Sequence, residues 1–474
     1  MKNITVKDII RICDAKLICG NEYTECENFE KDSRLIKSGD VFVGIKGENF
    51  DGNLMYEDAI KNGATLCIVS GIIPQKHEGN TVIKVKDSVT ALQQIAEYKR
   101  SLYNIPVIAV TGSVGKTSTK DIVASVMSEK YKTLKTQGNL NNHIGLPLTV
   151  LKLKDHEALV VEMGMNHFGE IRTLTNIVHP TISIINNIGT SHIGNLGSRE
   201  NILKAKLEIL EGTENTSPVI INNDNDLLSK WAKGNNTAHK IITYGIDNKS
   251  DVTATNIKYY EDRSIYNVKI IDKEYNIIVP VGGKHFIYNS LAAICAGIES
   301  NIEIEKIAEG IKKFKLTKRR MEIIESVQNG ATIVNDTYNA SYESVKAALE
   351  YLREVKSDRK IAILGDMLEL GEYSKEMHEK VGIEVARNNI DILITVGRES
   401  KNIVNKVEEL NTTTKTYQCK SIDDAIEIAK KELKKGDLVL VKASNGMHFD
   451  KIVEGIVWKL QSFLEEYQLN MMYQ

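Results

Sequence analysis

One short segment constrains the fold of this chain more than any other, because it joins an apolar run to a glycine-rich loop and a helical pattern. Residues 106–110 (Pro-Val-Ile-Ala-Val) read as a buried strand, and residues 111–117 (Thr-Gly-Ser-Val-Gly-Lys-Thr) follow directly. Apolar residues then recur on one helical face at Ile122, Val123, Val126 and Met127. A strand, such a loop and a helix form a phosphate-binding unit, because the glycines let backbone N–H groups turn toward an anion.

The loop predicts a nucleoside triphosphate as the ligand. At this spacing Lys116 can reach the β- and γ-phosphates, and the Thr117 hydroxyl can bind Mg²⁺. The loop departs from the general pattern because Val110 stands where a first glycine is usual. The residues expected to bind the nucleotide here are Gly112, Ser113, Gly115, Lys116, Thr117 and Ser118.

Length and charge limit what such a nucleotide-binding chain can be. With 474 residues the chain is too long for one typical core, and about three domains are expected. Its 61 basic and 63 acidic residues leave a net charge of −2, so no global field draws it to nucleic acid or to an anionic membrane. The longest apolar runs have strand length and the N-terminus lacks a signal-peptide core, so we expect a cytoplasmic protein without membrane insertion. The six cysteines lack zinc-finger spacing and are expected to be reduced.

Apolar runs alternate with helical patterns along most of the chain, which predicts an α/β fold with three domains. Residues 1–85 mix short strands and turns and predict a small mixed α/β domain. Residues 86–314 predict a central P-loop ATPase domain with a parallel sheet, and residues 315–474 a C-terminal Rossmann-like domain. The strand-length runs that follow the phosphate loop are at 158–161, 182–185, 219–221, 241–243, 332–334, 360–364, 392–396 and 438–441.

Ligands of parallel sheets collect beyond the carboxyl ends of the strands, where this chain places two candidate metal ligands. Glu162 ends an apolar run, where a carboxylate is costly unless it is paired or bound to a cation; a helix-capping glutamate is the alternative. His192 follows the end of another predicted strand, although a lone histidine is usually a structural residue. Fourteen residues further on, Lys206 lies on a predicted helix, where a lysine commonly only faces solvent.

Taken together, these features resemble the Mur ligases of bacterial cell-wall synthesis. Residues 111–119 look like the family's Thr-Gly-x-x-Gly-Lys-Thr-x-Thr loop, and residues 138–147 look like its Gly-Asn-x-Asn-Asn-x-Ile-Gly-x-Pro segment. The resemblance implies that Glu162 and His192 bind magnesium and that Lys206 is carbamylated by CO₂, which turns a cation into a carboxylate-like ligand. The implied metal ligands are Thr117, Glu162, His192 and Lys206. The implied catalytic residues are Lys116, His192 and Lys206.

One helix of the central unit implies an adenine contact. Residues 283–293 are similar to the family's Gly-x-His-Asn-x-x-Asn-x-x-Ala-Ala helix. The second asparagine of that motif contacts adenine, and this role falls on Asn289. Phe286 replaces the first asparagine, so the resemblance implies no contact from that position.

The outer units imply further contacts. Residues 320–322 and 335–340 look like the branch of the family that adds D-alanyl-D-alanine, with Arg320 and Asp336 as nucleotide contacts delivered by domain closure. Residues 32–34 and 47–52 resemble the uridine-nucleotide motifs of the same branch. The implied substrate contacts are Ser33, Arg34, Asn139, Asn142 and Asn339. The chain departs from the branch at Ser341, Tyr342, Ala443 and Asn445.

The resemblance implies an ATP-dependent ligase that joins D-alanyl-D-alanine to UDP-N-acetylmuramoyl-tripeptide through an acyl phosphate. ATP and Mg²⁺ are the implied cofactors, and a monomer is expected. A sibling ligase that adds the third amino acid is the alternative, but its usual Asp-Asn-Pro-Arg motif is absent from this sequence. A folylpolyglutamate-type ligase would lack the separate first domain, and a nucleotide-driven switch protein would have no reason to bind a uridine nucleotide sugar. Diaminopimelate and lysine both stay open as the third residue of the acceptor.

Overall fold

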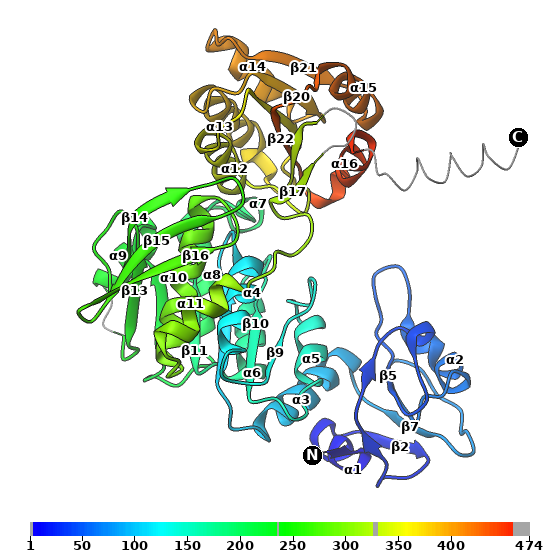
Figure 1. Ribbon diagram of the computed structural model, residues 1–474. Coiled ribbons are helices and arrows are strands. Elements are labelled where there is room, and N and C mark those ends of the chain that lie inside the picture. The colour runs from blue at the N-terminus through cyan, green and yellow to red at the C-terminus, as the bar shows by residue number, and fades with distance from the viewer. Residues whose placement is uncertain (1–2, 235–236, 326–329, 458–474) are drawn as a thin grey trace, which may run out of the picture.

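The computed structural model describes residues 3–234, 237–325 and 330–457. Figure 1 shows three lobes in chain order, each with a β-sheet and flanking helices, so the predicted α/β fold with three domains is confirmed. The C-terminal lobe lies directly against the central lobe, whereas the N-terminal lobe, in blue, stands apart and joins the central lobe near α3 (Ser88–Ser101). The domain boundaries at 85/86 and 314/315 stay predictions, and residues 1–2 and 458–474 of the predicted outer domains lie outside the described residues.

The N-terminal lobe is a small mixed sheet with short helices. Thr5 starts the first helix because its hydroxyl accepts a hydrogen bond from the Asp8 N–H, while the Asp8 carboxylate accepts one from the Thr5 N–H. The main sheet runs β2-β7-β6-β5-β4, with β2 antiparallel to β7 and the other neighbours parallel. The elements are β1 (Ile4–Thr5), α1 (Val6–Cys13), β2 (Lys16–Cys19), β3 (Glu25–Cys26), β4 (Phe29–Glu30), η1 (Ser33–Leu35), β5 (Val41–Val43), η2 (Gly52–Met55), α2 (Tyr56–Lys61), β6 (Leu66–Val69) and β7 (Thr81–Lys84).

The central lobe is built around β8 (Val107–Thr111), whose residues are all buried. Its nine-stranded sheet, counted over the described residues, runs β16-β15-β14-β13-β12-β11-β8-β10-β9. Because β8 pairs in parallel with both β10 and β11, the loop after β8 opens at the same sheet edge as the ends of its two neighbours. The strands that follow β8 are β9 (Thr133–Lys135), β10 (Ala158–Glu162), β11 (Ile182–Ile185), β12 (Val219–Asn222), β13 (Ile241–Gly245), β14 (Val252–Tyr259), β15 (Ser264–Ile270) and β16 (Lys273–Val279).

The helices of this lobe cover the sheet, and α10 and α11 pack against α4, the helix that follows the phosphate loop. The helices are α4 (Lys116–Met127), α5 (Gly145–Val150), α6 (Glu170–Val178), α7 (Ile193–Leu196), α8 (Arg199–Leu207), α9 (Asp226–Gly234), α10 (Lys284–Glu299) and α11 (Ile304–Lys312). The predicted parallel sheet is confirmed from β9 to β14, and β15 and β16 extend it with antiparallel pairings. Apolar runs did not predict these two strands, because buried and more exposed residues alternate along β15, as in sheets with one solvated face.

The C-terminal lobe holds a sheet in the order β17-β18-β22-β19-β20-β21, parallel except for β17. Ser341, one of the departures from the family pattern, caps α12, because its hydroxyl accepts a hydrogen bond from the Ser344 N–H. The elements are β17 (Glu322–Glu325), β18 (Thr332–Asn335), α12 (Tyr342–Glu354), β19 (Arg359–Gly365), η4 (Gly371–Tyr373), α13 (Ser374–Arg387), β20 (Ile392–Val396), α14 (Lys401–Glu409), β21 (Lys415–Cys419), α15 (Ile422–Glu432), β22 (Asp437–Lys442) and α16 (Asp450–Ile456).

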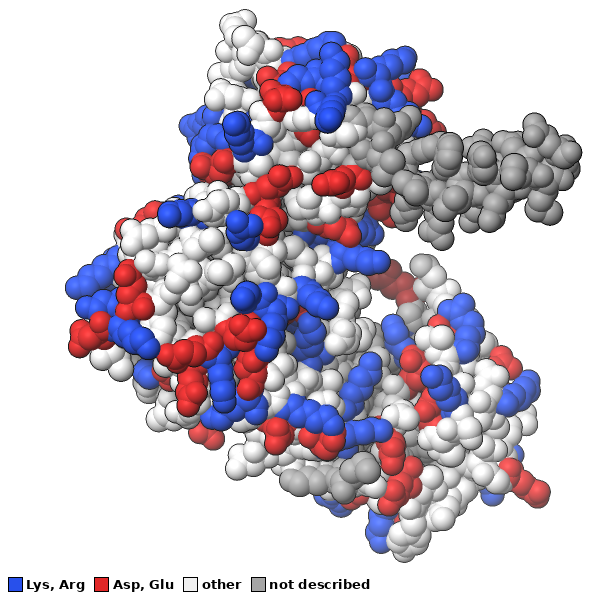
Figure 2. Space-filling view, viewed as in Figure 1, with Lys and Arg blue, Asp and Glu red and all other residues white. Residues whose placement is uncertain are grey.

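The surface carries both signs of charge. Figure 2 shows Lys and Arg side chains interspersed with Asp and Glu side chains over the face in view. None of the helices in the described ranges combines the length and the apolar character that crossing a bilayer requires.

Candidate active site

A cavity of about 500 Å³ lies where the central and C-terminal lobes meet. The phosphate loop, the strand-end segments after β10 and β11, helix α10 and the start of α12 all contribute to its wall. The predicted site residues that line it are Ser113, Gly115, Lys116, Thr117, Ser118, Asn139, Asn142, Glu162, His192, Asn289, Arg320, Asp336 and Asn339. Gly112 starts the loop, and Lys206 is buried in α8 without lining the cavity. Ser33 and Arg34 lie in η1 of the N-terminal lobe, and none of the described residues of that lobe lines this cavity.

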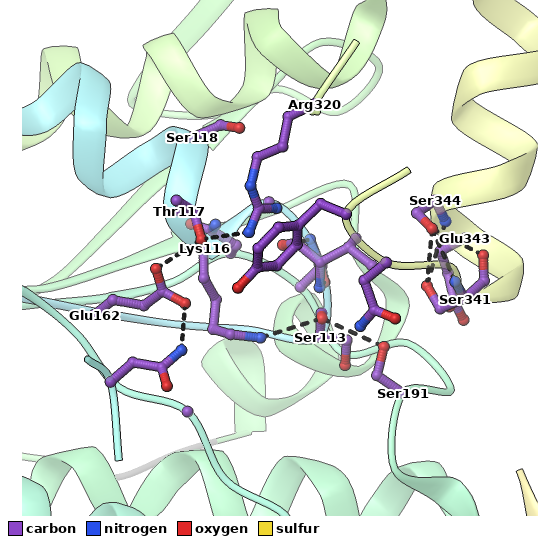
Figure 3. A pocket seen from close by; sticks show the side chains of 18 of the residues that line it. Ser113, Lys116, Thr117, Ser118, Glu162, Ser191, Arg320, Ser341, Glu343 and Ser344 are labelled. Atoms are coloured by element: carbon purple, nitrogen blue, oxygen red, sulfur yellow. Dashed lines mark hydrogen bonds between the residues drawn. The ribbon is translucent and has the colours of Figure 1, made fainter. Parts of the chain in front are cut away.

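The phosphate loop wraps around the Lys116 side chain. Gly112 and Gly115 have φ angles of 153° and 79°, which favour glycine, and a Cβ atom on Gly115 would lie 2.9 Å from Asn289 Oδ1. Lys116 Nζ donates hydrogen bonds to the carbonyl oxygens of Gly112 at 2.9 Å and Ser113 at 3.3 Å, as Figure 3 shows for Ser113. Burial lowers the pKa of Lys116, and the charge of Arg320 adds to the shift. The loop therefore holds the Lys116 amine at the point where the sequence predicts phosphate.

Glu162 and Thr117 form the polar floor beside the loop. The Thr117 hydroxyl donates to Glu162 Oε2 at 2.7 Å, and Asn141 Nδ2 donates to Glu162 Oε1 at 2.8 Å (Figure 3). Arg320 reaches in from the C-terminal lobe and donates through Nη2 to the Thr117 hydroxyl at 2.9 Å. Glu162 is only 3% exposed, and its contacts are to side chains rather than to the N–H groups of a helix. A buried carboxylate next to a hydroxyl suits Mg²⁺, which takes one or two protein oxygens and fills its other positions with water and phosphate.

His192 stands at the end of the loop after β11. Burial lowers its pKa to about 4, and the charges of Lys116 and Lys206 act in the same direction. The imidazole is therefore neutral near pH 7 and keeps a lone pair that can bind a metal. Over the described residues no three His, Cys, Asp or Glu side chains converge on one point, so a cation here needs Thr117, nucleotide oxygens or a modified lysine as well.

Lys206 is a buried amine and only 1% exposed. Among the described residues it forms no ion pair with a carboxylate. Burial lowers its pKa well below the usual value, and the charge of Lys116 contributes. The neighbouring Lys204 is exposed. Lys204 therefore has the solvent exposure of an ordinary surface lysine, whereas the burial of Lys206 is what a functional lysine would show.

The C-terminal lobe supplies charged groups to the opposite wall. The Arg320 guanidinium lies 3.9 Å from the centre of the Tyr338 ring, and Lys442 Nζ bonds to Asp336 and donates to the Asn339 carbonyl oxygen at 2.8 Å. The structure thus places Arg320 and Asp336 in the wall of the cavity that the phosphate loop also lines, and their roles as nucleotide contacts delivered by closure stay predictions. The hydrogen bond from Arg320 to Thr117 joins residues 203 positions apart in the chain.

Comparison with known proteins finds relatives that match nearly the whole chain. Residues 27–100, 110–297 and 319–445 match the family descriptions "Mur ligase family, catalytic domain", "Mur ligase middle domain" and "Mur ligase, glutamate ligase domain". The UDP-N-acetylmuramoyl-tripeptide–D-alanyl-D-alanine ligase of Bacillus subtilis is 36% identical over 96% of this chain and 98% of its own length. The chain belongs to the Mur ligase family.

Solved Mur ligase structures share the fold. A crystal structure of MurF from Acinetobacter baumannii matches with a TM-score of 0.87 at 27% identity, over 96% of this chain and 99% of that one. MurF from Thermotoga maritima, solved in complex with ADP, matches with a TM-score of 0.80 at 28% identity, over 91% of this chain and 97% of that one. The resemblance drawn from the sequence motifs is confirmed.

Several residues of this Mur ligase cavity received no predicted role from the sequence. Asn141 and Lys442 lie inside motif segments in which other residues were assigned roles. Lys442 ends β22, so a search for polar residues at strand ends would have found it. Glu343 also lines the cavity, from the first turn of α12. His285 does too, with a buried Nδ1 atom that has no hydrogen-bond partner and a pKa lowered by burial to about 4.

Proposed function

We propose that this chain is an ATP-dependent ligase that joins D-alanyl-D-alanine to UDP-N-acetylmuramoyl-tripeptide through an acyl phosphate, in the synthesis of peptidoglycan precursors. The observation that carries the proposal is the cavity between the central and C-terminal lobes, where Lys116, Glu162, Arg320 and Asp336 meet. The relatives that match 95–96% of the chain carry this activity in their names, which favours it over a sibling ligase that adds the third amino acid.

ATP is the proposed energy source. The Thermotoga relative was solved with ADP, and this chain offers the phosphate loop and a buried asparagine, Asn289, beside Gly115. The proposed nucleotide contacts are Gly112, Ser113, Gly115, Lys116, Thr117, Ser118, Asn289, Arg320 and Asp336. A carboxylate is inert toward amines because its oxygen leaves poorly, and phosphorylation supplies a good leaving group. Lys116 and Arg320 would stabilise the negative charge that gathers on the transferred phosphoryl group.

Mg²⁺ and a carbamylated Lys206 complete the proposed site. Thr117, Glu162 and His192 would hold the cation together with the modified lysine, and the cation would supply charge neutralisation at the phosphates. The support for carbamylation is the burial of Lys206 without a carboxylate partner in the described part of the chain, because a neutral amine reacts with CO₂ and the product is an anion that Lys116 can stabilise. His192 is cast as a metal ligand and not as a base, because it stands beside two lysines in a buried setting.

The substrates are assigned to the lobes as follows. Residues 1–85 would bind the UDP-sugar peptide through Ser33 and Arg34, residues 86–314 would bind ATP, and residues 315–474 would close on the nucleotide and the incoming dipeptide. Asn139, Asn142 and Asn339 are the proposed substrate contacts in the cavity wall. Closure excludes water before the acyl phosphate forms, which protects it from hydrolysis. We also propose a monomer in the cytoplasm, because one chain supplies every group of the site and ATP is abundant there.

Incubation of the purified chain with ATP, Mg²⁺, the tripeptide acceptor and D-alanyl-D-alanine tests the proposal. ADP, phosphate and the pentapeptide product should appear in equal amounts, and omission of either substrate should stop product formation. Lys116→Ala should lose activity, whereas Lys204→Ala, which changes an exposed lysine, should keep it. A nucleotide-driven switch protein would hydrolyse ATP without forming a peptide bond, and that outcome would contradict the proposal.

A further inference from the structure

The loop that carries His192 is hydrogen-bonded to the C-terminal lobe. Glu343 accepts hydrogen bonds from the Thr190 N–H at 2.7 Å and from the Thr190 hydroxyl at 3.1 Å. At the far end of the loop, the Tyr373 hydroxyl donates to the Gly197 carbonyl oxygen at 2.7 Å. The segment around His192 is therefore held at both ends by groups that belong to another lobe.

Between these two contacts, the backbones of the two lobes touch. A Cβ atom on Gly194 would lie 2.8 Å from the Glu369 carbonyl oxygen and 2.9 Å from the Gly371 nitrogen, so glycine at this position allows α7 to pack on the segment before η4. Glu369 itself adopts a left-handed backbone conformation, with φ of 63°, which is uncommon outside glycine. The position of Glu369 against α7 is thus determined by backbone packing and does not depend on its carboxylate.

The Glu369 carboxylate lies next to a polar atom that lacks a partner. His192 Nδ1 is buried and has no hydrogen bond of good geometry, while Glu369 Oε2 stands 3.0 Å away. A buried ring nitrogen normally has a partner, and in the described part of the chain Glu369 is the carboxylate within ion-pair distance of this histidine.

We propose that Glu369 is a positioning residue for His192: in the closed protein its carboxylate accepts a hydrogen bond from Nδ1–H, which leaves the lone pair of the ring on Nε2. The inference rests on the proposed role of His192 as a metal ligand. A carboxylate behind a ligating histidine selects the tautomer, fixes the ring and raises the basicity of the other nitrogen.

The consequence is a coupling between closure and metal binding. Because Glu369 belongs to the C-terminal lobe and His192 to the central lobe, opening the cavity removes the acceptor from Nδ1. A cation that prefers the Nδ1–H tautomer then binds more tightly to the closed form, and by linkage it favours closure to the same extent. Glu343 strengthens the coupling because it holds Thr190, two residues before His192.

The test compares Glu369→Ala and Glu369→Gln with Glu372→Gln, which removes an exposed carboxylate three residues away. In the metal-free protein with ADP at pH 7, long-range ¹H–¹⁵N NMR of labelled histidines reports the His192 tautomer. The His192 signal is assigned as the one that is missing from the spectrum of His192→Gln. The wild type and Glu372→Gln should show the Nδ1–H form, and Glu369→Ala should lose it. Mn²⁺ affinity in the presence of ADP, measured by electron paramagnetic resonance, should fall by about 10- to 100-fold in Glu369→Ala, with a smaller loss in Glu369→Gln.

An unchanged tautomer and an unchanged Mn²⁺ affinity in Glu369→Ala would overturn the proposal. So would a variant that only raises the KM for D-alanyl-D-alanine, because Glu369 would then bind the incoming amine. The Glu369 side chain is 60% exposed, so unfolding of the variant is not expected, and circular dichroism checks this. The tautomer and the Mn²⁺ affinity are measured without peptide-bond formation, so failure of the proposed ligase activity and failure of this inference are separate results.

Discussion

Asp121 is the charged centre of a buried cluster behind the phosphate loop, and we predict that Asp121→Ala is strongly destabilising. Its Oδ1 atom lies 2.8 Å from Lys120 Nζ and 2.7 Å from Lys135 Nζ. Its Oδ2 atom accepts a hydrogen bond at 2.7 Å from the hydroxyl of Thr317, which lies three residues before Arg320. Asp121 therefore links α4 to β9 and to the segment that enters the C-terminal lobe.

The size of the effect follows from burial. The Lys120 side chain is 3% exposed, and without Asp121 the one hydrogen bond left to its ammonium among the described residues is to the Thr136 carbonyl oxygen. Removing one partner of a buried ion pair costs about 3–5 kcal/mol, because the other charge stays buried without compensation. Lys135 is 36% exposed, so Lys135→Ala should cost about 1 kcal/mol or less. The double variant Lys120→Met, Asp121→Ala should recover part of the loss, because no buried charge is left unpaired.

Hydrogen exchange of α4 amides at increasing urea concentration measures the opening free energy of this region alone, which suits a chain of several domains. Burial by itself would raise the pKa of Asp121, but Lys120 and Lys135 outweigh it and hold the pKa below its usual value. The stabilisation is therefore present above the ordinary aspartate pKa and is lost as the pH falls below it. The reasoning is refuted if Asp121→Ala costs no more than Lys135→Ala at neutral pH.

Three further predictions concern other sites. Lys206→Ala should lower ligase activity by on the order of 10²-fold or more, with partial recovery in added short carboxylates, and a fully active variant would exclude the carbamate. Because burial lowers the pKa of His285 to about 4, the unfolded chain takes up this proton first, and the unfolding free energy should fall as the pH drops from about 6.5 to 4. Hydrogen exchange of α10 amides at increasing urea concentration and several pH values should show a shallower decline in His285→Leu, and an identical slope would contradict the assignment. Gly310→Ala should cost about 1–3 kcal/mol, since its Cβ would lie 2.7 Å from Val126 Cα; a thermal midpoint equal to wild type would show that α11 can shift.

Local pattern was enough to predict the nucleotide-binding unit. The strand, the loop and the start of α4 occupy one continuous stretch, and each part has a composition that few other structures tolerate. That the Glu162 carboxylate has a polar partner could also be predicted, because a charged residue at the end of an apolar run is rare without one. The strands β15 and β16 could not, since their alternating pattern is shared with many exposed segments.

Contacts between residues far apart in the sequence were revealed only by the tertiary structure. Sequence motifs named Arg320 and His192 but carried no information on the atoms that each would meet. The packing of the C-terminal lobe decides that Arg320 reaches the Thr117 hydroxyl and that Glu369 stands behind His192. Helix and strand periodicity reflects which face of an element is buried, whereas the meeting of side chains more than a hundred positions apart depends on how whole lobes pack.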